Sequence, residues 1–151
     1  MVIQELEERI KRLETGMNQM IRQGIVTQVF PDKGRVKVRL PDSDQMETAE
    51  LPVVFAKTLE NKAYDMPDVG EHVVCVFMPN GMEQGMVLGA VYSGQDPVPV
   101  NHVDKTHYRF KDGSFMEYDR DTHELSIDIK GGITINAATQ IRMSAPRIDL
   151  N

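Results

Sequence analysis

The side chains best suited to chemistry are few in this sequence, and they are widely spaced. The four histidines are His72, His102, His107 and His123, and Cys75 is the single cysteine. No histidine lies two, three or four residues from another, and no cysteine cluster exists. Metal sites need several such ligands converging on one point. A metal site within one chain is therefore not predicted.

Nucleophilic and acid–base catalysis are not indicated either. The sequence contains no Gly-x-Ser-x-Gly motif and no phosphate-loop spacing. Asp119 and Asp121 lie in a predicted turn, where short carboxylates support the backbone. Cys75 lies inside the apolar run of residues 73–77, so we expect a buried, unreactive thiol. No catalytic residue, no metal ligand and no cofactor is predicted.

The charge balance excludes further classes of partner. The formal net charge is −6, which is the wrong sign for binding nucleic acid phosphates or an anionic membrane surface. The content of hydrophobic residues, 40%, is that of a folded protein. No apolar run approaches the ~18 residues of a membrane span, and no signal-peptide pattern is present at the N-terminus.

A heptad repeat runs through the first segment, residues 1–22. Its apolar positions alternate three and four residues apart, and most of the positions between them are charged or carry amides. The stripe is too narrow for a helix packed on a globular core and fits a seam between helices. We expect a coiled-coil-like helix. Its predicted oligomer interface consists of Ile3, Leu6, Ile10, Leu13, Met17 and Met20.

Two questions about this helix stay open. A single amphipathic helix lying on its own domain is the alternative to a seam between chains. Isoleucine at the a positions with leucine at the d positions nominally favours two strands. Three heptads are too few for that rule to decide the oligomer, and the C-terminal segment argues for three chains.

Short strands separated by turns fill the second segment, residues 23–100. Residues 35–40 alternate strictly between charged and aliphatic side chains, which is typical of a half-buried strand, and the apolar residues 72–78 suit a central strand. Further strands are predicted at 24–30, near 49–55 and at 85–92, with turns at 31–34, 41–44 and Pro79-Asn80-Gly81. Five short strands of this kind predict a small closed barrel of the OB type.

The third segment, residues 101–151, opens with a predicted hairpin and continues as a long alternating run. The hairpin turns at Lys111-Asp112-Gly113. From Leu125 the odd-numbered positions are mostly apolar and the even-numbered ones mostly polar, with one phase shift at Pro146. Strands of globular proteins are usually ~5 to 6 residues long, so this run is too long for one of them.

The apolar face of this run has almost no aromatic bulk, so it must bury against something narrow. The barrel strands already account for the barrel core, and we expect sister chains around a threefold axis to cover the face. The predicted fold is mainly β: an N-terminal helix, an OB-fold barrel and a C-terminal intertwined triple-stranded β-helix or β-prism stalk. A β-meander inside a larger monomeric barrel is the alternative. The predicted stalk interface consists of Leu125, Ile127, Ile129, Ile133, Ile135, Ile141, Met143, Ile148 and Leu150.

Several stretches, taken in order, resemble a known family. In the barrel segment they are residues 24–29, 35–41, 66–73 and 85–94, and in the third segment they are residues 112–119, 125–129 and 131–137. Together they resemble the phage baseplate assembly protein V family. That family includes the central spikes of contractile phage tails and is similar to the spike protein of type VI secretion.

The resemblance implies a structural, non-enzymatic protein of the virion, located in the tail baseplate and assembled in the host cytoplasm. It implies a homotrimer that docks on tail tube and baseplate proteins and pierces the host outer membrane on contraction. Nucleic acid is not expected as a partner. OB barrels that bind single strands need aromatic platforms and a basic groove, whereas this chain is acidic and has no tryptophan.

The sequence departs from the family at its end. Many members finish in a His-x-His tip that holds iron on the axis, whereas this sequence finishes at Asp149-Leu150-Asn151. A separate tip-capping protein, or a tip beyond this sequence, would complete the stalk, and an axial metal there stays open. The alternative function is an OB-fold binding module that recruits a protein or ligand. Such a module would stay soluble and active without residues 125–151, whereas a spike would lose its trimer.

Overall fold

The computed structural model describes residues 1–79 and 81–151, with the side chains of residues 81–83 left out. The predicted turn at Pro79-Asn80-Gly81 includes residue 80, so it lies outside the described residues. The chain divides into two compact units, Met1–Pro97 and Val98–Asn151. Within the described part of the chain, no helix is both long enough and apolar enough to cross a membrane.

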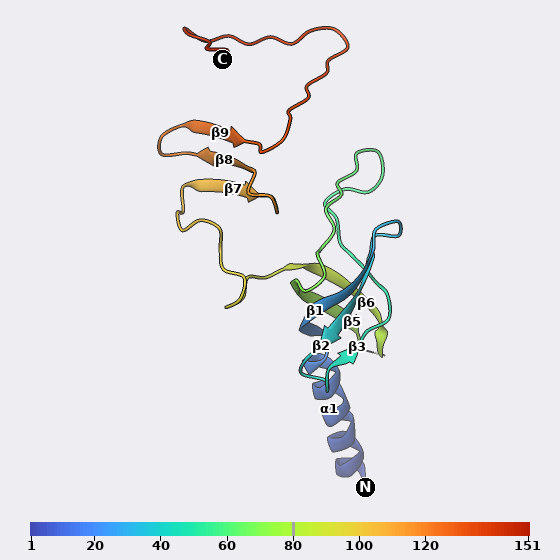
Figure 1. Cartoon of the computed structure of the whole chain (residues 1–151). Helices are drawn as coiled ribbons and strands as arrows, with labels where there is room; N and C mark the ends of the chain where they lie inside the picture. Colours follow the sequence, from blue (N-terminus) through green and yellow to red (C-terminus); the bar gives the residue numbers. More distant parts are fainter. Residues whose placement is uncertain (80) are drawn as a thin grey trace. The chain divides into compact units, whose positions relative to one another are not determined.

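The first unit consists of one helix followed by six strands (Figure 1). These are α1 (Val2–Asn18), β1 (Ile21–Phe30), β2 (Arg35–Leu40), β3 (Met46–Glu47), β4 (Leu51–Pro52), β5 (His72–Met78) and β6 (Gly81–Ala90). The predicted strands 35–40 and 72–78 are confirmed at their predicted bounds. β1 begins three residues earlier than predicted, because residues 21–23 extend its pairing with β5. β6 likewise begins at Gly81 rather than residue 85.

The strands of this unit form an antiparallel sheet that curls back on itself. The order is β3-β2-β1-β5-β6, and β4 pairs with β2. The chain beyond β4 then meets β6 at the far end of that order, through the parallel bridge between Val53 and Val87 and a 2.9 Å hydrogen bond from the amide of Val54 to the carbonyl of Val87. This closure produces a small barrel, as expected of an OB-type domain.

The alternating residues of these strands supply the barrel core. Each strand places every second side chain inside, so β2 buries three residues while Arg35, Lys37 and Arg39 point away from the core. The buried apolar residues are Val26, Val36, Val38, Leu40, Leu51, Val73, Cys75, Phe77 and Val87. Cys75 is fully buried, as predicted. The barrel therefore shelters its own apolar face without another chain.

Two glycines allow neighbouring strands to come close inside the barrel. A side chain at Gly24 would collide with the side chain of Val38 on the neighbouring strand. A Cβ atom at Gly85 would lie 2.5 Å from the ring of Phe77 and 2.8 Å from the carbonyl oxygen of Val76. Residues larger than glycine at these positions would displace the strands that close the core.

The second unit begins as a three-stranded antiparallel meander, separate from the barrel sheet. Its strands are β7 (Lys105–Arg109), β8 (Phe115–Asp119) and β9 (Glu124–Asp128), in the order β7-β8-β9. The hairpin predicted around residue 112 is confirmed. Gly113 has a φ of +87°, and the Asp112 carboxylate accepts a 2.9 Å hydrogen bond from the amide of Ser114, which closes the turn.

Residues 129–151 contain no strand in the single chain. Their alternation between apolar and polar residues is that of a strand, but a strand needs a neighbour to accept and donate its backbone hydrogen bonds. The mainly β fold with an N-terminal helix and an OB-type barrel is confirmed. The intertwined stalk is not formed by one chain and stays a prediction.

Candidate functional site: exposed apolar stripes and a pocket

The apolar stripe of α1 lies open to solvent along its whole length. The helix buries none of its residues. Five of the six predicted interface residues are at least half exposed, namely Ile3, Leu6, Ile10, Leu13 and Met17. The sixth, Met20, follows the helix and is partly buried. The alternative of an amphipathic helix lying on its own domain is not what the structure shows, because such a helix would bury this stripe.

The end of α1 is fixed to the barrel by backbone hydrogen bonds. The amide of Gln19 bonds to the carbonyl of Thr15 at 3.2 Å, which completes the last turn. The carbonyl of Met20 then accepts a 2.7 Å hydrogen bond from the amide of Phe77, a residue of the barrel core. The stripe on α1 is therefore presented by a helix whose C-terminal end is tied to a rigid β-strand.

A second apolar surface lies on one face of the meander. Paired residues of antiparallel strands share a face, and the pairs Tyr108–Met116 and Met116–Ile127 line up three such side chains across the sheet. The pair Tyr118–Leu125 adds two more on the same face. All five side chains are exposed. The opposite face carries polar groups, so the meander has an apolar side that the single chain does not cover.

On the polar face of the meander, charged side chains contact one another. Glu117 on β8 lies between two basic groups: its Oε1 is 3.0 Å from Nδ1 of His107, and its Oε2 is 3.3 Å from Nζ of Lys105. Burial opposes ionisation of Glu117, but the hydrogen bonds from His107 and Lys105 outweigh it, and the net result is a lowered pKa. The His107 ring also stacks on Phe115, with centroids 5.4 Å apart. These contacts join Lys105, His107 and Glu117 to one another on the polar face.

The apolar surface continues beyond β9 into residues 129–151. Ile129 is partly buried, and the other predicted interface residues in this stretch are exposed, from 49% for Ile148 to 85% for Leu150. Those between them are Ile133, Ile135, Ile141 and Met143. Ser114, itself 3% exposed, anchors the start of the stretch, because its hydroxyl oxygen accepts a 3.0 Å hydrogen bond from the amide of Lys130.

The exposed apolar surface of the meander also includes residues that precede Leu125, the first residue of the predicted stalk interface. Leu125 and Ile127 were predicted as interface residues, and the pairing of the meander adds Tyr108, Met116 and Tyr118 to their face. The alternate spacing of the apolar residues within each predicted hairpin strand indicates that they lie on one face of that strand. That the apolar faces of the three strands coincide follows only from the register of β7 with β8 and of β8 with β9. The alternative of a meander inside a larger monomeric barrel disagrees with the separate three-stranded sheet.

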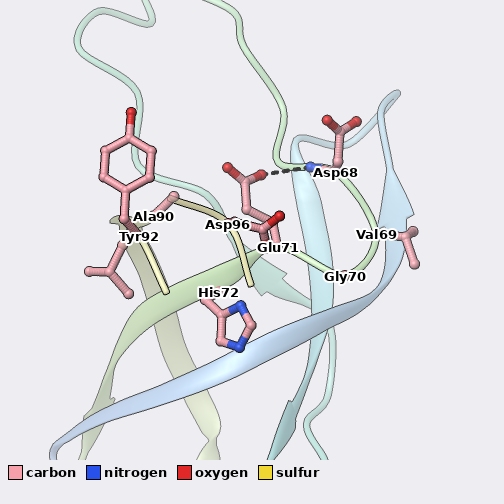
Figure 2. Close-up of a pocket in the computed structure, with 9 residues that line it drawn as sticks. Asp68, Val69, Gly70, Glu71, His72, Ala90, Tyr92 and Asp96 are labelled. Atoms are coloured by element: carbon pink, nitrogen blue, oxygen red, sulfur yellow. Dashed lines mark hydrogen bonds between the residues drawn. The ribbon is translucent and has the colours of Figure 1, made fainter. Parts of the chain in front are cut away.

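A pocket of about 490 Å³ lies in the barrel unit, where the loop before β5 meets the end of β6 (Figure 2). Its lining includes three carboxylates, Asp68, Glu71 and Asp96, together with His72 and Tyr92. The Glu71 carboxylate accepts a 2.8 Å hydrogen bond from the backbone amide of Asp68, so it closes the local turn. Nδ1 of His72 is buried and has no hydrogen-bond partner among the described residues.

The titratable groups of the described residues do not form a candidate metal site. No group of three His, Cys, Asp or Glu side chains with metal-binding geometry occurs within residues 1–79 and 81–151. Burial raises the pKa of the Cys75 thiol to about 11, which keeps it protonated and unreactive at neutral pH. The candidate functional surfaces are therefore the apolar stripe of α1 and the apolar surface of the meander and residues 129–151. Both lie exposed to water, although apolar side chains are more stable when buried.

Comparisons with known proteins agree with the geometry of the barrel. Residues 22–92 match the family described as the Type VI secretion system/phage-baseplate injector OB domain. The chain is also similar to the spike protein of Escherichia phage P2, with 27% identity over 154 aligned residues that cover 92% of this chain and 72% of the relative. The predicted resemblance to the phage baseplate assembly protein V family is therefore confirmed, and residues 22–92 are the part of the chain that matches its injector OB domain.

Proposed function

We propose that this chain is a structural spike of a contractile phage tail baseplate and that it works as a homotrimer. The observation that carries the proposal is the alternating apolar stripe from Leu125 to Leu150. The single chain leaves most of it exposed, and after Asp128 it has no strand partner among the described residues. The injector OB domain and the similarity to a phage spike protein support the same role.

A trimer would provide the C-terminal stretch with the strand neighbours and the apolar contacts that it lacks in one chain. Three copies wound about a common axis would turn their apolar sides inward and would provide each other's missing strand neighbours. Burying one Ile or Leu side chain contributes about 1.5–3 kcal/mol, and each position is copied three times. Pairing between chains would also hide the strand edges that otherwise invite aggregation.

The mechanical role follows from that arrangement. A stalk of interlocked strands cannot lose one chain without exposing the apolar axis, so it resists bending and shear as one unit. We propose that the stalk transmits the force of contraction through the host outer membrane, while the barrels and helices dock on tail tube and baseplate proteins.

The molecular mass of the full chain in solution tests the proposal. Sedimentation equilibrium should give three times the chain mass of 17.1 kDa. A chain truncated after Asp128 keeps the barrel and the complete meander and should lose the trimer. A full chain that sediments at 17.1 kDa at micromolar concentration would overturn the proposal.

The OB-fold binding module remains the second candidate, because the pocket beside Tyr92 is large enough for a small ligand or a peptide side chain. The two candidates differ in what the truncation removes. A binding module should keep its ligand affinity without residues 129–151, whereas a spike should lose its assembly into virions. Complementation of a spike-deficient phage with the truncated chain distinguishes them.

A further inference from the structure

The charges beside the apolar stripe of α1 follow a pattern that the stripe alone does not require. With Ile3 at the first a position, the residues that flank the seam occupy the e and g positions of the heptad. The e positions are Glu7 and Glu14, and the g positions are Val2, Arg9 and Gly16. Charges at e and g positions set the partner and the direction of a coiled coil. The sequence therefore carries information about how α1 pairs.

The pattern is complementary to itself in one direction only. In a parallel assembly, a g side chain lies beside the e position five residues further along the neighbouring helix. That rule brings Arg9 of one copy beside Glu14 of the next, so opposite charges meet. An antiparallel assembly would place e beside e, and Glu7 and Glu14 would then face carboxylates of the other helix. Like charges at such short range repel.

The groups concerned are available for a neighbouring chain. In the part of the chain that the structure describes, neither Arg9 nor Glu14 has an ionic or hydrogen-bonding side-chain partner. The ion pair that α1 does form joins Arg12 and Glu8 at 4.0 Å. These two residues occupy the c and f positions, away from the seam. The ion pair within the helix thus lies on its outer face and involves neither Arg9 nor Glu14.

We infer that α1 docks against the α1 helices of sister copies, in parallel and in register, with an Arg9–Glu14 ion pair between each adjacent pair of chains. The inference rests on the proposed homotrimer and adds the direction, register and pairing residues of its N-terminal seam. Burial of the apolar stripe stabilises the bundle, because a helix of 17 residues is marginal alone. The ion pairs select the parallel direction.

A thiol at the start of the seam tests direction and register in the full chain. Ile3→Cys in a parallel, in-register bundle brings the new thiols of neighbouring chains within reach of a short bis-maleimide linker. In an antiparallel bundle the two positions would lie about 20 Å apart, from the 1.5 Å rise per helical residue. Leu6→Cys is the second variant. Wild-type protein controls for Cys75, and Glu8→Cys at the outward f position should give at most about a tenth of the linked product.

Charge exchange tests the ion pair. Glu14→Arg should lower the crosslinking yield of the Ile3→Cys chain several-fold at low salt, and the double change Arg9→Glu with Glu14→Arg should restore it. Glu8→Arg makes the same substitution at the f position and should leave the yield unchanged. In about 1 M salt, where charges are screened beyond roughly 3 Å, the difference between Glu14→Arg and the parent should shrink.

The outcomes separate this inference from the proposed function. A particle of trimeric mass without crosslinking at Ile3→Cys or Leu6→Cys would overturn the parallel seam and leave the spike proposal standing. Linkage between Ile3→Cys and Met17→Cys chains in a mixed sample would overturn it in favour of antiparallel pairing. A monomeric full chain would overturn both.

Discussion

The barrel and the C-terminal stretch use the same kind of residue in the same alternation, yet they reach opposite states. On β2, Val36 and Val38 alternate with charged residues and are fully buried. In the C-terminal stretch, Ile133 and Ile135 also alternate with polar residues, and they are 64% and 69% exposed. β2 has partner strands along its length, whereas residues 129–151 have no partner strand among the residues that the structure describes. Alternation thus defines which face is apolar, and the available neighbours decide whether that face is covered.

The largest effect is expected from a charge on the apolar side of the C-terminal stretch. Ile133→Asp should abolish the trimer, because each of three copies loses about 1.5–3 kcal/mol of burial and must also desolvate a carboxylate. Thr134→Asp is the matched control on the polar side and should leave the assembly intact. Sedimentation equilibrium gives the mass. Equal behaviour of the two variants would show that this stretch does not have a buried side.

Replacing a large side chain of the barrel core should lower the stability of each single chain, whether or not the chains assemble. Phe77 is 2% exposed and lies in the barrel core. Phe77→Ala should lower the free energy of unfolding by about 3–5 kcal/mol, because it removes buried surface and leaves a cavity. Urea unfolding of the chain truncated after Asp128 measures this without the stalk. An unchanged unfolding midpoint would contradict the assignment of this core.

A smaller effect is expected where the barrel buries a charge. Arg22 is 6% exposed and bonds to the Asp42 carboxylate at 2.7 Å. Asp42→Asn should cost about 1 kcal/mol, discounted because the Asp42 side chain is 62% exposed and water screens the pair. The hydroxyl of Ser43 also accepts a hydrogen bond from Arg22, so Ser43→Ala tests whether this neutral group contributes as much as the carboxylate. A loss in Asp42→Asn no greater than in Ser43→Ala would mean that the charge is not what matters.

The same pair predicts the sign of a pH effect. The hydrogen bond from Arg22 holds the pKa of Asp42 below its usual value, 3.8. A carboxyl group whose pKa is depressed by folding contributes stability that is present above the unfolded pKa and is lost as pH falls through the folded pKa. Wild-type protein should therefore lose more stability than Asp42→Asn between about pH 5 and pH 2. Parallel pH profiles of the two would contradict the assignment.

The last prediction concerns the reaction rate of the buried Cys75 thiol, and no loss of stability is expected with it. Burial raises the pKa of Cys75 to about 11. Alkylation of Cys75 at pH 8 should be at least about a hundredfold slower in native than in unfolded protein, because the thiolate is the reactive form. Glu124→Cys at the exposed start of β9 serves as the accessible control. Equal alkylation rates of the two thiols would show that the barrel core is open.

Local patterns in the sequence were sufficient for several elements. The heptad of residues 3–20 predicted α1, and strict alternation predicted β2. The turn chemistry at Asp112 and Gly113 predicted the hairpin, since a left-handed glycine and an aspartate that bonds its own backbone define such a turn. Each of these signals lies within a few residues of the structure it specifies, which is why one sequence was enough.

Closure and pairing needed the tertiary structure. The meeting of Val53 with Val87 closes the barrel, and it joins residues that no local pattern connects. The burial of Arg22 is unexpected from its charge and follows from the nearby Asp42. The shared apolar face of Tyr108 and Met116 depends on the register of β7 with β8. The sequence by itself determined which residues are apolar and in what period, because those properties are local. Only the tertiary structure decided which apolar faces one chain can cover, because covering a face requires segments that are distant along the chain or belong to another copy.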